Sequence, residues 1–290
     1  MEIKEKHAYL IIAHNHFHTL EVLLRMLDDE RNDIFLHIDK KAPKISEERL
    51  RSCVNHSRLI FTKRISVYWG HSSQVDCEMV LLKRCVREGQ YAFVHLISGN
   101  DLPIQTQDTI HAFFDAHPNT QFLQVGNDEI HRYRLSRFHF GLKRHSKIRE
   151  IAADFLNTRC RVDRLKKYHG MPLAKTANWF SITGECAAYI VSKKRFIRRL
   201  TRYTACADEM FLGTVIKNSP YWQQVYKKEE SWDGHMRYID RIHNEGTSPH
   251  TLTMADKDIL LSSDMLWARK FDEDKDKQII ALIEKTYNAC

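Results

Sequence analysis

Residues that interrupt or cross-link a chain are scarce in this sequence, which has 10 Gly, 6 Pro and 7 Cys among its 290 residues. With a 43% share of hydrophobic residues, this composition excludes a collagen-like, fibrous or disordered chain and predicts a compact fold. The cysteines are odd in number, form no Cys-x-x-Cys pair and lie mostly within apolar periodic segments. We therefore expect free, buried thiols.

Long hydrophobic runs are also missing. The apolar run near the N-terminus extends only from Ala8 to Ala13, which is too short for the core of a secretory signal or for a membrane span. Together with the free thiols, this predicts a protein of the reducing cytoplasm. The net charge of +8 and the pI of about 9.0 favour an anionic partner, and charge alone leaves nucleic acid, a membrane surface and a phosphorylated small molecule open.

Common signatures of phosphate, metal and nucleophile chemistry are absent, namely GxGxxG, the P-loop, HExxH and GxSxG. His14, His16 and His18 have no cysteine or carboxylate at ligand spacing, so a polar loop facing a nucleotide is preferred to a zinc site. Acidic pairs with Asp-x-Asp spacing follow no predicted buried strand, and we interpret them as surface charges; they are Asp256/Asp258, Asp272/Asp274 and Asp274/Asp276. The sequence therefore predicts no metal and no cofactor.

Short apolar runs alternate with segments of helical periodicity along the chain. The predicted strands are residues 7–14, 34–38, 58–61, 91–98, 120–125 and 179–183. The predicted helices are residues 20–27, 75–86 with Ser72 or Ser73 as the cap, 109–116, 148–157, 184–192, 194–203, 208–217 and 272–287. This alternation predicts an α/β fold with a central, mostly parallel sheet, whose ligands bind beyond the carboxyl ends of the strands.

Asp39 ends the second predicted strand. A carboxylate in that position can accept hydrogen bonds from a ribose hydroxyl or a base N–H, and a turn or helix-cap aspartate is the equally supported alternative. Asp208 and Glu209 begin a predicted helix, where Asp208 suits the cap and Glu209 suits a general base for an acceptor hydroxyl. The sequence leaves these alternatives open.

Arg269 and Lys270 follow Leu266-Trp267 and are the best-placed cations for a departing diphosphate. From charge alone, an exposed pair at the start of a helix is the simpler interpretation of these two residues. The excess of Arg, His and Lys in residues 127–176, where periodicity weakens, predicts a loop-rich segment with one or two helices.

A series of segments follows in a specific order: AYLIIAH, IFLHIDKKA, VYWGHSSQVDCEMVLLKR, FVHLISGNDLPI, WFSITGECAAYIV, ADEMFLGTVIKNS, and SPHTLTMADKD with LWARKFD. Together, over about residues 7–274, they resemble the core-2/I-branching β-1,6-N-acetylglucosaminyltransferase family, glycosyltransferase family 14, including its bacterial members. The resemblance implies a GT-A type nucleotide-sugar fold, no metal-binding Asp-x-Asp and an inverting single displacement. It also implies one domain, residues 1–290, with a nucleotide-sugar half (1–126) and an acceptor and catalytic half (127–290).

The resemblance assigns Glu209 as the catalytic base and Lys270, beside Arg269, as the contact to the UDP diphosphate. Animal members place a second phosphate-binding arginine where this sequence has Thr247, so Arg241 or Arg237 would have to substitute.

The same resemblance places Asp39 and the loop of His14 and Asn15 against the uridine. Asp101 would lie near the donor sugar or shape its own turn. For the acceptor side, which the resemblance leaves least defined, the candidate residues are Arg134, Arg137, Trp179 and Asp208.

The function expected from the sequence is transfer of N-acetylglucosamine from UDP-N-acetylglucosamine to a hydroxyl of a glycan or lipid-linked oligosaccharide, with a β-1,6 linkage, in bacterial surface polysaccharide synthesis. Peripheral contact with the inner face of the membrane stays open. One alternative is a transferase that uses UDP-xylose or UDP-N-acetylgalactosamine. Another is a non-enzymatic binder of acidic polymers, suggested by the net charge and by Tyr133, Phe138 and Phe140 among arginines. No nucleic-acid motif is present, so no nucleic-acid partner is expected.

Overall fold

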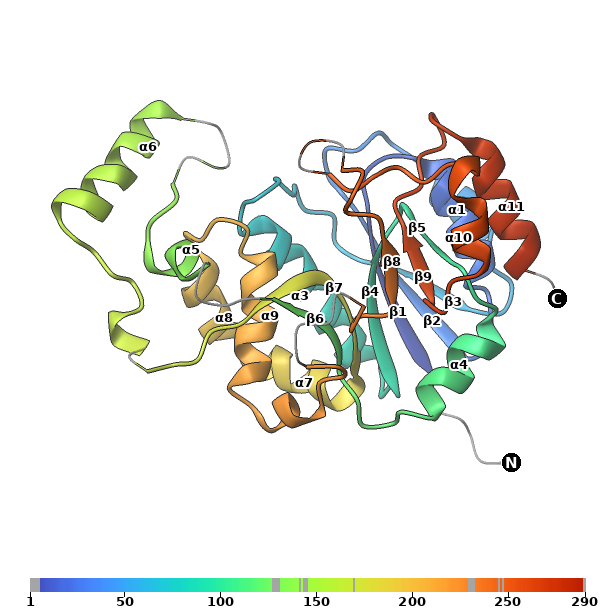
Figure 1. Ribbon diagram of the computed structural model, residues 1–290, viewed down its shortest axis with the longest axis horizontal. Coiled ribbons are helices and arrows are strands. Elements are labelled where there is room, and N and C mark those ends of the chain that lie inside the picture. Colours follow the sequence, from blue (N-terminus) through green and yellow to red (C-terminus); the bar gives the residue numbers. More distant parts are fainter. Residues whose placement is uncertain are drawn as a thin grey trace.

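The computed structural model describes residues 6–126, 131–140, 142, 146–168, 170–228, 233–244, 246 and 248–288. Its centre is a six-stranded sheet in the order β3-β2-β1-β4-β7-β6 (Figure 1). Strands β3, β2, β1 and β4 run parallel to one another, whereas β7 pairs antiparallel with both β4 and β6. The strands are β1 (His7–Ala13), β2 (Asn32–Ile38), β3 (Arg58–Phe61), β4 (Phe93–Ser98), β6 (Phe122–Gly126) and β7 (Lys175–Thr183). The predicted α/β fold with a mostly parallel central sheet is confirmed.

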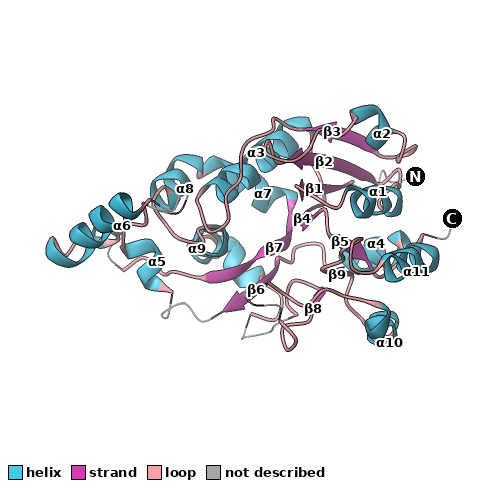
Figure 2. Ribbon diagram, turned by 90° about the horizontal axis from the view of Figure 1, so that it is seen from above, coloured by secondary structure: helices cyan, strands magenta, loops and turns pink. Residues whose placement is uncertain are grey.

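Both faces of the sheet are buried, which explains the near-continuous apolar runs of its strands. Along β1, Tyr9 and Ile11 belong to one hydrophobic cluster, and Ala8 and Leu10 belong to the other. The first cluster includes residues of α1 (Phe17–Met26), α4 (Gln107–Asp115) and α11 (Lys277–Tyr287). The second includes residues of α3 (Ser73–Glu88), α7 (Gly184–Ser192) and α9 (Asp208–Lys217). Figure 2 shows the two helical layers on opposite sides of the sheet.

A second, three-stranded sheet lies over the first cluster in the order β5-β9-β8. Its strands are β5 (Asp101–Pro103), β9 (Trp267–Arg269) and β8 (Arg237–Ile239), and the sequence did not predict them. Strands of three residues carry too little alternation to be recognised. The remaining helices are α2 (Glu47–Arg51), α5 (Arg132–Ser136), α6 (Lys147–Asp154), α8 (Lys194–Thr201) and α10 (Lys257–Leu261), with a π-helical turn at Phe155–Arg159.

Arg237, the first residue of β8, connects the two sheets. Its buried guanidinium donates hydrogen bonds to Leu96 O at 3.2 Å, to Phe180 O at 2.8 Å and to Ser181 Oγ at 3.2 Å. It also packs on the Trp267 ring, 4.8 Å from the ring centroid. Burial lowers the pKa of Arg237 to about 9, so the group still carries its charge at neutral pH.

Three details differ from the expectations. The helix predicted at 272–287 begins at Lys277, because the Asp276 carboxylate accepts hydrogen bonds from Gln278 N and Ile279 N and thereby caps it. The Ser72 side chain makes no capping hydrogen bond to α3. All six described cysteines are free, but Cys160 is exposed and Cys53 and Cys206 are half-buried, so buried thiols are confirmed only at Cys77, Cys85 and Cys186. Cys290 lies outside the described residues. No helix among the described residues is both long and apolar enough to cross a membrane.

We expect Arg237→Met to lower the free energy of unfolding by about 3 kcal/mol, because it leaves the acceptors in β4 and β7 without their buried donor. Urea unfolding followed by circular dichroism measures the change. Arg241→Met is the matched control, since it removes the same charge four residues further on from an exposed side chain. Equal losses of stability in both variants would contradict this role for Arg237.

Candidate functional site

A cavity of about 1220 Å³ opens at the carboxyl ends of β1, β2 and β4. Residues that follow these strands line it, including His14, Asn15, Asp39 and Asn100. Because β7 runs antiparallel to β4, its first residues, Lys175 to Trp179, reach the same edge of the sheet. The predicted position of the site at the strand ends therefore coincides with this cavity.

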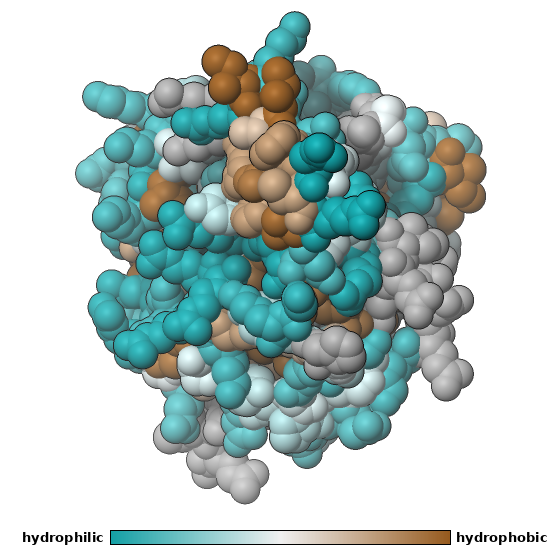
Figure 3. All heavy atoms as spheres, turned by 90° about the vertical axis from the view of Figure 1, so that its left-hand side faces the viewer, coloured by the Kyte–Doolittle hydropathy of each residue, from teal (hydrophilic) through white to brown (hydrophobic). Residues whose placement is uncertain are grey.

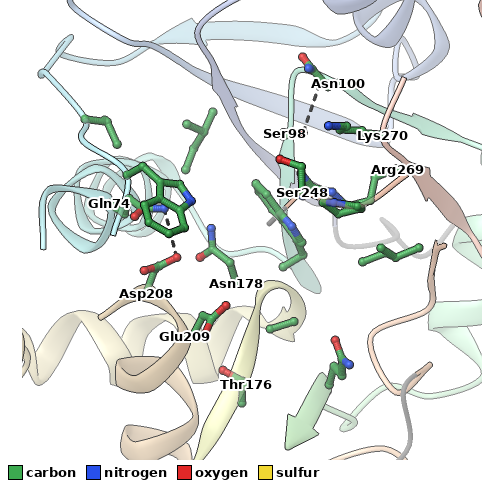
Figure 4. Close-up of a pocket in the computed structure, with 18 of the residues that line it drawn as sticks. Gln74, Ser98, Asn100, Thr176, Asn178, Asp208, Glu209, Ser248, Arg269 and Lys270 are labelled. Carbon is green, nitrogen blue, oxygen red and sulfur yellow. Dashed lines mark hydrogen bonds between the residues drawn. The ribbon is translucent and has the colours of Figure 1, made fainter. Parts of the chain in front are cut away.

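The acidic wall of the cavity is the first turn of α9. Gly213 lets this helix lie directly on β7, since a Cβ there would stand 2.6 Å from Thr176 Cγ2 and 3.0 Å from Ala174 O. Glu209 lies one helical turn before Gly213 and lines the cavity beside Thr176 and Asn178 (Figure 4). The close approach of helix and strand thus sets the position of this carboxylate.

Two cations contact the Glu209 carboxylate. Arg134 Nη1 donates a hydrogen bond to Oε2 at 2.5 Å, and Lys175 Nζ lies 3.7 Å from the same oxygen. These contacts hold the carboxylate in a fixed position. Both of these contacts are made to Oε2.

Asp208 lies beside Glu209 but differs from it in burial. Ala207 is the N-cap residue of α9 and Asp208 makes no capping hydrogen bond, so the predicted cap is wrong. Instead, its Oδ2 accepts a hydrogen bond from Gln74 Nε2 at 3.2 Å, and its buried Oδ1 has no hydrogen-bond partner. Burial, and then the neighbouring Glu209 charge, raise the pKa of Asp208 to about 7.

The cationic wall lies across the cavity at the end of β9 (Figure 4). Arg269 is the last residue of β9 and Lys270 follows it, so the interpretation as an exposed pair at a helix start is wrong. The Arg269 guanidinium stacks on Trp179 at 4.2 Å from the ring centroid, and its Nε lies 3.7 Å from Asp101 Oδ1. Its buried Nε and Nη1 have no hydrogen-bond partner. Donors held in this way suit the oxygens of an anionic ligand.

Asp101 does not line the cavity. Its carboxylate accepts hydrogen bonds from Ser98 N at 2.9 Å and Ser98 Oγ at 2.7 Å, so it shapes its own turn, as one of the two predicted roles requires. The Asp39 carboxylate lines the cavity and accepts hydrogen bonds from Lys41 N at 2.7 Å and Val67 N at 3.3 Å. These contacts fit the turn interpretation of Asp39 and leave its cavity face for a ligand. Asn15 contributes a buried Oδ1 that has no partner.

Of the two substitutes predicted for the missing arginine, only Arg241 lines the cavity, where its Nη2 donates a hydrogen bond to Gln124 Oε1 at 3.0 Å. Arg237 cannot substitute for the missing arginine, because its guanidinium is hydrogen-bonded to carbonyls of β4 and β7. Thr247 itself lies outside the described residues.

Among the acceptor candidates, Trp179 and Asp208 line the cavity, Arg134 reaches it only through Glu209, and Arg137 is exposed elsewhere. Sequence reasoning missed Trp69, which lines the cavity with 76% of its surface exposed. The signal available was an aromatic residue directly before Gly70, whose φ of 67° marks a tight turn.

The histidine and Asp-x-Asp segments meet in space, which the sequence analysis did not anticipate. His16 Nδ1 lies 3.4 Å from Asp272 Oδ1 and 3.6 Å from Asp274 Oδ2, and the three residues form a group that could hold a metal ion. Asp272 stands three residues after the buried strand β9, so the statement that no such pair follows a buried strand is wrong. His16 and Asp272 both line the cavity, and a metal-dependent mechanism would hold its ion there.

Comparison with known proteins gives one family. The family described as Core-2/I-Branching enzyme matches residues 7–263. Xylosyltransferase 2 of Canis lupus familiaris is 22% identical over an alignment of 301 positions, which covers 96% of this chain and 33% of that protein. Xylosyltransferase 1 of Homo sapiens is 20% identical over 227 residues, which cover 74% of this chain and 22% of that protein. The chain thus spans a third or less of the length of these curated relatives.

Among solved structures, the apo form of mouse xyloside xylosyltransferase 1 aligns with a TM-score of 0.36 and 10% identity, over 74% of this chain and 83% of that one.

The raised pKa of Asp208 predicts a dependence of stability on pH. Its folded-state pKa of about 7 lies above the ordinary value of 3.8, so the folded state binds the extra proton between these values. The free energy of unfolding therefore falls as pH rises from about 4 to about 7, by at most roughly 1.4 kcal/mol per pH unit. We expect Asp208→Asn to make this decline shallower in urea unfolding measured across that range, while the buried Glu78, whose pKa is also raised by burial, keeps its own contribution. Asp76→Asn, an exposed aspartate in the first turn of α3, should retain it. An unchanged slope in Asp208→Asn would contradict the assignment.

Proposed function

The chain belongs to the core-2/I-branching enzyme family, and from that premise we propose that it is a glycosyltransferase that moves a sugar from a UDP-sugar to a hydroxyl of a glycan or lipid-linked saccharide. The observation that carries the proposal is the opposition of Glu209 to Arg269 and Lys270 across one cavity (Figure 4). Transfer with inversion needs a base on one side of the anomeric carbon and cations at the leaving phosphate on the other. The two walls supply these groups.

In the proposed reaction, Glu209 takes the proton of the acceptor hydroxyl as that oxygen attacks the anomeric carbon. The contacts of Arg134 and Lys175 with Oε2 hold the carboxylate in place and leave Oε1 for the proton. The bond between the anomeric carbon and the phosphate oxygen breaks in the same step, and UDP leaves with the bonding electrons. A single displacement of this kind inverts the anomeric configuration.

The departing UDP carries the charge that the cationic wall stabilises. Arg269 lines the cavity, and the planar guanidinium of an arginine suits two oxygens of a diphosphate. Lys270 and Arg241 also line the cavity and add positive charge to it. At the ends of β1 and β2, Asn15 and Asp39 offer oxygen atoms that suit the N–H and hydroxyl groups of a nucleoside.

UDP-N-acetylglucosamine remains our proposed donor, with transfer to a 6-hydroxyl in the synthesis of a surface polysaccharide. UDP-xylose is the specific alternative, because curated relatives of this chain carry the name xylosyltransferase. Release of UDP from a panel of UDP-sugars with pooled glycan acceptors decides between the two donors.

We expect Glu209→Gln to lower acceptor-dependent UDP release by about a hundredfold or more, because the amide cannot take the proton. Binding of UDP, measured by calorimetry, should stay within about twofold, since Glu209 lies on the wall opposite Arg269. Glu185→Gln is the matched control, because Glu185 is an exposed acid in the first turn of α7.

Two outcomes would contradict the assignment. Full activity in Glu209→Gln would remove Glu209 as the base. Loss of UDP binding along with activity would place Glu209 in the donor site instead.

The absence of a metal requirement is also part of the proposal, because Arg269, Lys270 and Arg241 supply the positive charge that a divalent ion would otherwise provide. Transfer should therefore persist in EDTA and should be unchanged in Asp272→Asn, which disrupts the group of His16, Asp272 and Asp274. Transfer that is lost in EDTA, restored by magnesium or manganese and absent in Asp272→Asn would establish a metal-dependent reaction at that group.

A further inference from the structure

Helix α6 carries an apolar face that no described element covers. Ile148, Ile151 and Phe155 are 81%, 69% and 56% exposed, although large apolar side chains are normally buried. Their spacing of three and four residues places them, together with the exposed Ala152, on one face of the helix. Within α6, only Ala153 is buried. The helix is thus amphipathic but uses its apolar face for no internal packing.

This helix lies at one end of the molecule. Figures 1 and 2 both show α6 projecting at the same end as α5 and α8, far from β3 and α11. Seen from that end, hydrophobic atoms gather at the upper edge and are bordered by hydrophilic ones (Figure 3). A single exposed apolar side chain needs no explanation, whereas a contiguous apolar face indicates an interaction site.

Positive charge is concentrated in the segment of the chain that carries α5, α6 and α8. Residues 131–203 contain 19 Lys and Arg and 4 Asp and Glu, a net charge of +15, whereas the rest of the chain has 26 and 33, a net charge of −7. Exposed members of this basic set lie on α6 itself, on α8 and on the turn between them; they include Lys147, Arg149, Lys166, Lys167, Arg195, Arg198 and Arg199. The chain is thus polarised, with one basic end and an acidic remainder.

Specific contacts tie these parts together. The Asn157 side chain, in the π-helical turn after α6, accepts a hydrogen bond from Phe138 N at 2.8 Å and donates one to Phe138 O at 2.9 Å. Arg164 donates hydrogen bonds to Leu200 O in α8 at 2.9 Å and to Arg137 O at 3.0 Å. The segment that carries the apolar face is therefore anchored to the helix that carries the basic face.

From these observations we propose that the end formed by α6 and α8 docks on an anionic phospholipid bilayer. The apolar face of α6 enters the boundary between headgroups and acyl chains, and the lysines and arginines around it contact lipid phosphates. The net negative charge of the rest of the chain orients the basic end toward the membrane. A soluble acidic polymer would use the charges but not the apolar face, so the bilayer accounts for both features. The inference does not depend on the proposed reaction.

Co-sedimentation of the full chain with vesicles tests the docking. We expect binding to vesicles that contain about 30% phosphatidylglycerol, and at least about tenfold weaker binding to pure phosphatidylcholine. The variant Ile148→Gln/Ile151→Gln/Phe155→Gln keeps every charge and should bind the anionic vesicles about tenfold more weakly. Ile259→Gln/Leu261→Gln removes exposed apolar side chains of α10 instead and should bind as the native chain does.

Circular dichroism and thermal unfolding confirm that each variant folds, so a loss of binding is read only from folded protein. The proposal is overturned if the native chain does not bind anionic vesicles. It is also overturned if the α6 variant binds them as tightly as the native chain while soluble polyphosphate competes fully, because charge alone would then explain the binding and an acidic polymer would be the partner.

Discussion

The geometry of the cavity depends on one buried guanidinium. Arg237 bonds to carbonyls of β4 and β7 at Leu96 and Phe180, and so fixes the small sheet against the large one. A buried cation is stable only where carbonyls or other acceptors lie close to it, and the bonds of Nη2 to both strands therefore determine the position of β8. Because β9 pairs with β8, the end of β9 is determined too, and Arg269 comes to lie on Trp179 at the mouth of the cavity. An interaction far inside the fold thus sets the cationic wall.

The two walls of the cavity carry side chains of opposite charge. Arg269 and Lys270 form a positive wall, and Glu209 faces it with its charge compensated by Arg134. A second full negative charge beside Glu209 would repel an anionic donor. Because burial raises the pKa of Asp208 to about 7, much of that second charge is absent at neutral pH. Burial of one acid thereby makes the other compatible with a phosphate ligand.

Helix α5 connects the cavity to the basic end of the molecule. Arg134 from this helix holds Glu209, while the next residue, Leu135, packs with Leu165 and Leu200 in a small core beneath α8. The acceptor side and the proposed membrane-docking end therefore share one helix.

Local periodicity in the sequence was sufficient for the main elements of the fold. The strand at 58–61 and the helices at 184–192 and 208–217 have the predicted bounds, because the alternation of apolar residues records which face of each segment is buried. Residues at strand ends, such as Asn15 and Asp39, line the cavity as expected because parallel strands end at one edge of a sheet. The order of short segments, through the family resemblance, selected Glu209 and Lys270 as candidate site residues. Both residues line the same cavity.

Contacts between distant segments were decided only by the tertiary structure. Arg134 lies 75 positions from Glu209, and Asp101 pairs with Arg269 across β5 and β9. His16 meets Asp272 only because the chain returns to the end of β1 after β9. The burial pattern of a segment follows from its own residues. Pairings between residues far apart in the sequence depend instead on which charges and carbonyls meet once the sheets have packed. The sequence by itself therefore determined the elements and the edge at which the site lies, and tertiary packing determined which side chains face one another there.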